Sequence, residues 1–270
     1  MKIPTERHKP HKTLSSYVWM VYGAPKIGKT TWANQWPMAL FLATEPGTAA
    51  MEAADIQINS WTDFTLAVKK LKETKGKHKW QTVVIDTVDN LYEFLSDNVC
   101  TTNKWEDLGD GGFGKGYKMA RRKLSNAIAA LRGLGMAVVF ISHERREIEA
   151  DDQGKRTGEV LITSALPGSA RKVLHGAVDF ILRAEMDEDQ SRLLRTAPFR
   201  DGSIHIECGS RGELGKPLPD TMELKFDALQ EAFRASFGEL DKKKTRKAKE
   251  AKKADDTETD DTPTNEKETD

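Results

Sequence analysis

The sequence predicts an α/β fold in which a mostly parallel central sheet carries helices on both faces and antiparallel strands at its C-terminal edge. Short apolar runs alternate along the chain with stretches of helical periodicity, a pattern typical of parallel sheets with crossover helices. The runs at Val83–Ile85 and Ala137–Ile141 are apolar on consecutive residues, as in strands that are buried on both faces. A chain of 270 residues is long enough for one core of this kind.

The predicted elements follow this alternation. A strand at Tyr17–Gly23 ends in glycine, and the helix that begins at Lys29 is stopped by Pro37. The rest of the parallel part consists of strands at Ala39–Glu45, Gln81–Val88 and Met136–His143 and of helices at Thr62–Thr74 and Tyr117–Gly135. Three later segments alternate in polarity and are predicted to add antiparallel strands at one sheet edge: Val178–Glu185, Ser191–Ala197 and Ser203–Gly209.

Composition restricts the class of protein only weakly. Lys+Arg and Asp+Glu both total 42, so a nucleic-acid partner has to be argued from local charge. Cys100 and Cys208 are far apart and indicate neither a disulfide framework nor a metal site. No secretory signal and no apolar run of about 18 residues are visible, so we expect a cytoplasmic protein without a membrane partner, in the host cytoplasm if it is phage-encoded.

Changes in composition divide the chain into three parts. Residues 1–16 are predicted to be a short basic arm and residues 17–240 the core. Residues 241–253 hold eight basic and two acidic residues, whereas residues 254–270 hold eight acidic residues and one lysine. So little apolar surface predicts a disordered tail, which serves solubility, makes an electrostatic contact with DNA or mimics a polyanion.

One segment has the pattern of a phosphate-binding loop. Residues 23–30 read GAPKIGKT, which fits G-x-x-x-x-G-K-[ST] and lies between a predicted strand and a predicted helix. In such loops backbone N–H groups surround phosphate oxygens, the lysine neutralises the β- and γ-phosphates, and the hydroxyl binds Mg²⁺. The sequence therefore predicts a site for ATP and Mg²⁺, made by Gly23, Ala24, Pro25, Lys26, Ile27, Gly28, Lys29, Thr30 and Thr31.

Three polar residues at predicted strand ends extend this site. Asp86 follows a buried run and is predicted to hold Mg²⁺ through water, together with Thr30. Glu45 and His143 end two other strands, and parallel strand ends share the sheet edge at which the phosphate loop lies. Glu45 is the candidate to polarise the attacking water and His143 the candidate γ-phosphate sensor. The alternatives are a solvated loop carboxylate and a strand-end hydrogen-bonding residue.

This order of motifs resembles the ATPase core of RecA-type proteins. More closely, the segments GAPKIGKTT, ATEPG, VVIDT, GKGYKMAR and VVFISHE resemble a compact phage-type branch of P-loop ATPases, RecA-like single-strand annealing and recombination proteins often labelled as AAA-domain proteins. The resemblance covers about residues 17–235. It implies catalysis by Lys29, Glu45, Asp86 and His143, although RecA proteins usually carry glutamine at the position of His143. It also implies an ATPase that acts on single-stranded DNA in recombination, annealing or repair, a homo-oligomer (ring or short filament), and single-stranded-DNA-binding or other recombination proteins as partners.

Two basic segments are candidate DNA contacts. No acidic residue occurs from Gly111 to His143, and basic residues interleave there with aromatic ones, which suits phosphate contact and base stacking. The candidates in this segment are Phe113, Lys115, Tyr117, Lys118, Arg121 and Arg122, and the alternative is a solvated helix face. The second segment, Arg145–Lys172, is predicted to be a loop of mixed charge with candidates Arg145, Arg146, Lys155 and Arg156.

Other readings of the same motifs stay open. Arg195 and Arg200 are candidates for basic fingers that complete the active site of a neighbouring subunit. A P-loop small-molecule kinase would use the segment Arg145–Lys172 as a lid, and a non-catalytic nucleotide-gated adaptor would bind without turnover. A ParA-like partitioning ATPase is disfavoured, because its motif needs a lysine where this chain has Ala24.

Overall fold

The computed structural model describes residue 5 and residues 10–150, 156–211 and 217–237. Half of the predicted N-terminal arm and the whole predicted tail lie outside the described residues. Within the described residues no helix is long and apolar enough to cross a bilayer.

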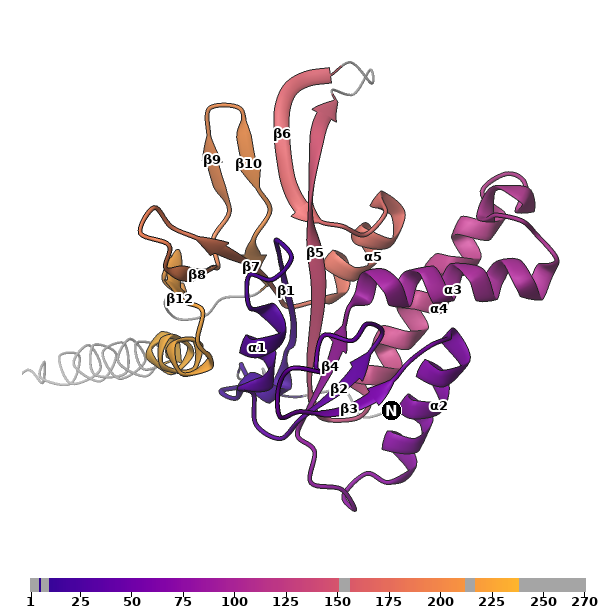
Figure 1. Ribbon diagram of the computed structural model, residues 1–270, viewed down its shortest axis with the longest axis horizontal. Helices are drawn as coiled ribbons and strands as arrows, with labels where there is room; N and C mark the ends of the chain where they lie inside the picture. The colour runs from indigo at the N-terminus through magenta and orange to yellow at the C-terminus, as the bar shows by residue number, and fades with distance from the viewer. Residues whose placement is uncertain (1–4, 6–9, 151–155, 212–216, 238–270) are drawn as a thin grey trace, which may run out of the picture.

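The centre of the molecule is a parallel sheet (Figure 1). Its strands run in the order β7-β1-β5-β4-β2-β3, and each neighbouring pair is parallel. Two short strands, β8 and β12, extend the β7 edge in antiparallel fashion, so the predicted fold class is confirmed. The bounds are β1 Val18–Gly23, β2 Ala39–Ala43, β3 Ala54–Gln57, β4 Thr82–Asp86, β5 Ala137–Ala150, β7 Phe180–Met186, β8 Arg192–Arg195 and β12 Thr221–Glu223.

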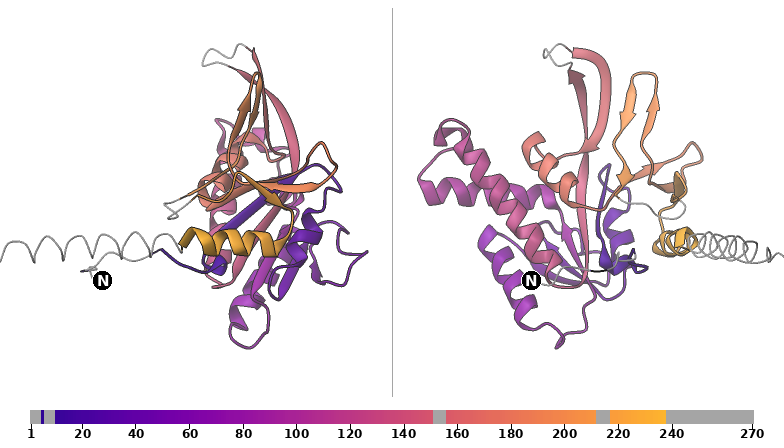
Figure 2. Two further views of the ribbon diagram at one scale, coloured as in Figure 1. Left: turned by 90° about the vertical axis from the view of Figure 1, so that its left-hand side faces the viewer. Right: turned by 180° about the vertical axis from the view of Figure 1, so that it is seen from behind.

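Helices cover both faces of this sheet (Figure 2). On one face α1 and the helical residues 226–237 pack over a cluster that includes Trp19, Trp32, Phe180 and Phe233. The other face carries four helices over a larger cluster that includes Met20, Ile85 and Phe140. The helix bounds are α1 Lys29–Asn34, α2 Trp61–Glu73, α3 Val88–Asn103, α4 Lys115–Arg132 and α5 Gly168–Ala177, with short 3-10 turns at Leu14–Ser16 and Leu108–Gly111.

Strand β5 belongs to two sheets. Its first half pairs with β1 and β4 in the centre, and from Glu144 onward it pairs with the antiparallel strand β6 (Arg156–Ser164). Strand β10 (Ile204–Ile206) adds to β6, and β9 (Phe199–Asp201) adds to β10. We call these four strands beyond Glu144 the arm, which projects from the top of the molecule in Figure 1.

Three segments differ from their predicted structure. Strand β7 was expected to be antiparallel but pairs in parallel with β1. Its polarity alternates because one face lies in the core whereas the other carries Arg183 and Glu185 in ion pairs. Strand β10 joins the arm, in parallel with β6, instead of the sheet edge. The predicted loop Arg145–Lys172 consists largely of strand, because its described residues form most of the β5–β6 hairpin and the start of α5.

Several elements were not predicted, including α3, α5, β3, β9 and β12. Helix α3 follows Asp86 directly, and Thr87 caps it by accepting a hydrogen bond from the backbone N–H of Asn90. Helix α5 and the short edge strand β3 were also missed, since β3 is mostly exposed and has no buried apolar run. The additional helices lie on the same face as α2 and α4 and complete the cover of that face.

The aromatic cluster on the α1 face offers a test of the fold. Trp19 is fully buried and stacks on Phe180 with ring centroids 4.0 Å apart, with Trp36 and Phe233 at its edges. We expect Trp19→Ala to lower the free energy of unfolding by about 3–5 kcal/mol because it leaves a cavity. Urea denaturation measures this, with Leu66→Ala as a matched control, since Leu66 is 57% exposed. Equal losses in the two variants would contradict the described packing.

Candidate functional site

The phosphate loop connects the carboxyl end of β1 to the start of α1. Lys29 is the first residue of α1, and its Nζ donates hydrogen bonds to the carbonyl oxygens of Gly23 and Ala24, at 2.9 Å each. Lys29 is 6% exposed, and burial lowers its pKa, whereas nearby carboxylates led by Asp86 oppose that shift. The loop therefore holds a positive charge in a place where only an anion could satisfy it further.

The backbone conformation of this loop requires two glycines. A Cβ at Gly23 would collide with the backbone carbonyl of Ala184 on β7, so only glycine allows β1 to turn there. Gly28 has φ of 108°, in the left-handed region, and is the residue directly before α1. The first N–H groups of α1 have no acceptor within the helix and directly follow the loop, as in anion sites at helix N-termini.

Thr30 and Asp86 meet at the bottom of the site. The hydroxyl of Thr30 donates to Asp86 Oδ2 at 2.7 Å, which joins α1 to the end of β4. Asp86 is 2% exposed, and burial raises its pKa to about 6 although the Thr30 hydrogen bond opposes this. Its other oxygen, Oδ1, is buried without a hydrogen-bond partner among the described residues. An unsatisfied carboxylate beside a hydroxyl is a fitting ligand pair for Mg²⁺, which prefers hard oxygen donors.

Glu45 and His143 face each other across the same site. His143 Nε2 lies 3.6 Å from Glu45 Oε1, and both side chains are about one third exposed. The parallel pairing of β5 with β1 places His143 beside Gly23, at the edge of the sheet where Glu45 follows β2. The structure thus brings together all four residues that were predicted to be catalytic.

Asp89 supports this arrangement and was missed by sequence reasoning. It lies in the first turn of α3, where Oδ1 accepts from the Ser142 hydroxyl and Oδ2 from the backbone N–H of His143, both at 2.7 Å. Burial raises the pKa of Asp89, and these hydrogen bonds oppose that shift. Asp89 thereby holds the middle of β5 at the site. A second aspartate three residues after Asp86 was the available signal.

A cleft of about 460 Å³ connects these groups. Three of its lining residues were not predicted, and one of them carries a charge: Arg192 from β8, on the opposite side of the phosphate loop from Asp86. Most of the predicted loop residues line the cleft, as do Gly47 and Met51. Its full lining is Pro25, Lys26, Gly28, Lys29, Thr30, Thr31, Glu45, Gly47, Met51, Asp86, His143 and Arg192.

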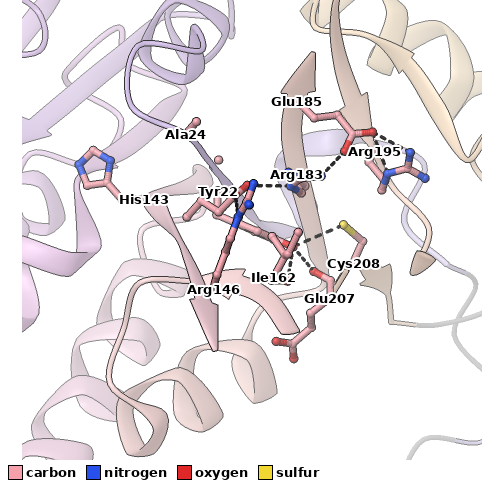
Figure 3. Close-up of polar contacts among 12 residues, drawn as sticks. Tyr22, Ala24, His143, Arg146, Ile162, Arg183, Glu185, Arg195, Glu207 and Cys208 are labelled. Atoms are coloured by element: carbon pink, nitrogen blue, oxygen red, sulfur yellow. Dashed lines mark hydrogen bonds and ion pairs between the residues drawn. The ribbon is translucent and has the colours of Figure 1, made fainter. Parts of the chain in front are cut away.

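The two predicted finger residues lie elsewhere. Arg195 bonds to Glu185 at 2.7 Å, as Figure 3 shows, and its guanidinium also lies over the ring of Phe199. It ends an ion-pair ladder across β5, β7 and β8, made by Arg146, Glu144, Arg183, Glu185 and Arg195. Arg200 in the arm pairs with Glu159 at 2.7 Å. Whether either residue reaches a neighbouring subunit stays a prediction.

The first group of DNA candidates lies at the start of α4 and is open to solvent. Phe113 is fully exposed in a left-handed conformation with φ of 46°, and Tyr117 is 46% exposed. Lys115 lies over the ring of Trp105 at 5.9 Å. Lys118, Arg121 and Arg122 are exposed further along the helix. The end of the α3–α4 pair projects to the right in Figure 1, away from the arm.

The second group of DNA candidates lies on the arm. Arg145 pairs with Glu147 at 3.0 Å and Arg146 with Glu144 at 3.5 Å, so part of their charge is balanced within the chain. Arg156 is exposed at the start of β6, and Lys155 lies outside the described residues. The candidate residues on the arm therefore carry less uncompensated positive charge than those of α4.

Comparisons with known proteins agree with this geometry. The sequence model of a family described as an AAA domain matches residues 15–202, which include the phosphate loop and every residue that lines the cleft. The SPbeta prophage-derived uncharacterized protein YorG of Bacillus subtilis (strain 168) is 32% identical over 219 residues. This match covers 77% of the chain and 64% of the relative, so the chain spans less than two thirds of the relative's length.

The raised pKa of Asp86 gives a testable dependence on pH. Because its pKa is higher in the folded state, the folded chain binds the proton more tightly, and Asp86 lowers stability as pH rises from about 4 through about 6. Without Mg²⁺ at pH 8, Asp86→Asn should raise the free energy of unfolding by at most about 3 kcal/mol, and the gain should vanish near pH 4. Urea denaturation in EDTA at both pH values checks this. A variant less stable than the wild type at pH 8 would contradict the burial of an uncompensated carboxylate.

Proposed function

Since this chain belongs to the AAA domain family, we propose that it is a P-loop ATPase that hydrolyses the γ-phosphate of ATP in the described cleft. The observation that carries the proposal is the meeting of Lys29, Glu45 and Asp86 there, on three different elements. A phosphate-binding cation, a metal-binding carboxylate and a partly exposed carboxylate are the groups that this reaction needs.

Binding precedes chemistry in this scheme. Lys29 and the N–H groups at the start of α1 hold the phosphates, which supply the anion that the buried ammonium lacks. Thr30 and Asp86 would hold Mg²⁺, which when bound neutralises charge on the β- and γ-phosphates. Asp86 must be ionised to do so, and a cation beside it lowers its pKa again.

Glu45 is the proposed general base. Its carboxylate is 31% exposed and can accept a proton from a water molecule in the cleft. His143 lies 3.6 Å away, where it can orient Glu45 and the γ-phosphate at the same time. Asp89 keeps His143 in place through the backbone of β5.

We also propose that single-stranded DNA is the partner of this ATPase. Support comes from the exposed aromatic side chains Phe113 and Tyr117, which lie beside the exposed cations of α4. Aromatic side chains stack on unpaired bases, and cations at helical spacing follow a phosphate backbone. The proposed role is in phage recombination, annealing or repair, and the prophage origin of the relative is consistent with it.

ATP turnover measured with and without single-stranded DNA tests the combined proposal. A DNA-dependent ATPase accelerates when DNA is added. Unchanged turnover would favour a small-molecule kinase or another partner, and binding without turnover would favour a nucleotide-gated adaptor.

Glu45→Gln separates binding from chemistry. The amide keeps the shape of the side chain but cannot accept a proton, so turnover should fall by at least about 10²-fold while ATP still binds. Steady-state phosphate release and equilibrium binding of a fluorescent ATP analogue give the two readouts. Lys29→Ala is the companion variant and should lose binding itself. If Glu45→Gln keeps wild-type turnover, another group activates the water.

Neutralising the α4 cations tests the DNA surface. With Lys115, Lys118, Arg121 and Arg122 replaced by alanine, the slope of log affinity against log salt should fall by up to about 0.7 for each lost phosphate contact. Fluorescence anisotropy with labelled single-stranded DNA measures the slope. The matched control removes four lysines from around α2, namely Lys70, Lys72, Lys75 and Lys77. Equal effects from both variants would show that the α4 cations act only through the net charge of the protein and form no specific DNA-binding surface.

A further inference from the structure

Arg192 is held at the cleft by a well-anchored backbone. The turn between β7 and β8 is closed by hydrogen bonds from the Asp187 N–H to the Ser191 carbonyl at 3.0 Å and from the Ser191 N–H to Asp187 Oδ1 at 2.7 Å. The carbonyl oxygen of Arg192 accepts from the N–H of Leu224 at 2.9 Å. The backbone of Arg192 is therefore held in place by the β7–β8 turn on one side and by Leu224 on the other.

The side chain of Arg192 lies on the phosphate-loop face of the sheet. Alternation along β8 puts Arg192 on the same face as Leu194, which is buried in the cluster beneath α1. The guanidinium Nη1 lies 3.2 Å from the point where a Cβ of Gly28 would be, so it reaches the loop directly. Arg195, three residues later, lies on the opposite face and is bound to Glu185 (Figure 3).

Among the residues that the structure describes, no carboxylate neutralises Arg192. Within the described ranges 10–150, 156–211 and 217–237 it has no ion pair and no side-chain hydrogen bond, although ion pairs engage Arg183, Arg195 and Arg200 nearby. An exposed guanidinium beside the loop and the N-terminus of α1 adds positive charge to a site that is already short of an anion. Such a group gains by pairing with an anionic ligand.

The strand order indicates which part of the ligand it meets. Asp86 ends β4, Glu45 follows β2 and His143 lies within β5, all on one side of β1, whereas β8 lies on the other side beyond β7. Thr30 and Asp86, which would hold Mg²⁺ next to the γ-phosphate, meet on the first side. Arg192 therefore faces the phosphates nearer the nucleoside.

We infer that Arg192 is a nucleotide-binding residue that acts within its own chain, pairing its guanidinium with the α- or β-phosphate of the bound nucleotide. The inference rests on the proposed function and deepens it, because it adds a substrate contact to that same cleft. Such a contact exists equally in ATP, in ADP and in the transition state for γ-phosphate transfer. It therefore contributes uniform binding, and its loss raises KM and leaves kcat largely unchanged.

Equilibrium binding of fluorescent ATP and ADP analogues tests the assignment, with circular dichroism as the check on folding. Arg192→Ala should weaken binding of both nucleotides about 10-fold or more, by a similar factor, with kcat at saturating ATP within about threefold of the wild type. Arg192→Lys keeps the charge but loses the two-pronged geometry and should lie between. Arg234→Ala, which removes an exposed arginine remote from the cleft, should bind like the wild type.

Three results would overturn the inference. The first is unchanged nucleotide affinity in Arg192→Ala. The second is a large fall in kcat at unchanged KM, which would indicate that Arg192 acts in the transition state. The third comes from mixing Arg192→Ala with Lys29→Ala. A residue that acts in its own chain gives no activity beyond the sum of the two, whereas recovery would show that Arg192 serves a neighbouring subunit.

Failure of the proposed function has a different signature. If the wild type binds neither ATP nor ADP, the cleft is not a nucleotide site and both proposals fall together. If the wild type and Arg192→Ala bind equally well while Lys29→Ala does not bind, only the inference about Arg192 falls.

Discussion

The parallel pairing of β5 with both β1 and β4 is the constraint on which the candidate site depends. It brings the carboxyl ends of β1 and β4 to the middle of β5, so that Gly23 lies beside His143 and Asp86 beside Ile141. The pairing is stabilised by burial on both faces, since β1 and β4 are buried along their whole length. Groups that are far apart in sequence therefore meet without any long loop to position them.

The same burial makes the site costly to the folded chain. Asp86 and Lys29 are both almost inaccessible to water, and the pKa of each is shifted toward the neutral form. Their mutual attraction opposes the shifts but leaves Asp86 Oδ1 without a partner in the part of the chain that the structure describes. A ligand that brought the missing charges would recover the folding free energy lost in this way, and this gain would favour binding.

The sequence was sufficient to predict those parts of the molecule in which a residue type at a fixed spacing has a single physical explanation. The loop before Lys29 and the buried run before Asp86 are of that kind, and both lie where they were predicted. Strand β7 was misjudged because its alternation reports the polarity of its two faces and not the direction of its neighbour. Arg192 was missed for a related reason. The register between β8 and β7 decides which face of β8 is turned toward the loop, and that register is known only from the fold.

The continuity of β5 has a mechanical consequence. A single strand of 14 residues begins in the central sheet, passes His143 and ends at the tip of the arm. At about 3.3 Å per residue, the seven residues after His143 span roughly 23 Å, and a tilt of about 5° at the cleft would displace the tip by about 2 Å. A hydrogen-bonded strand transmits such a tilt as a lever does, whereas a flexible loop would absorb it. The cleft and the arm are therefore joined by one continuous strand.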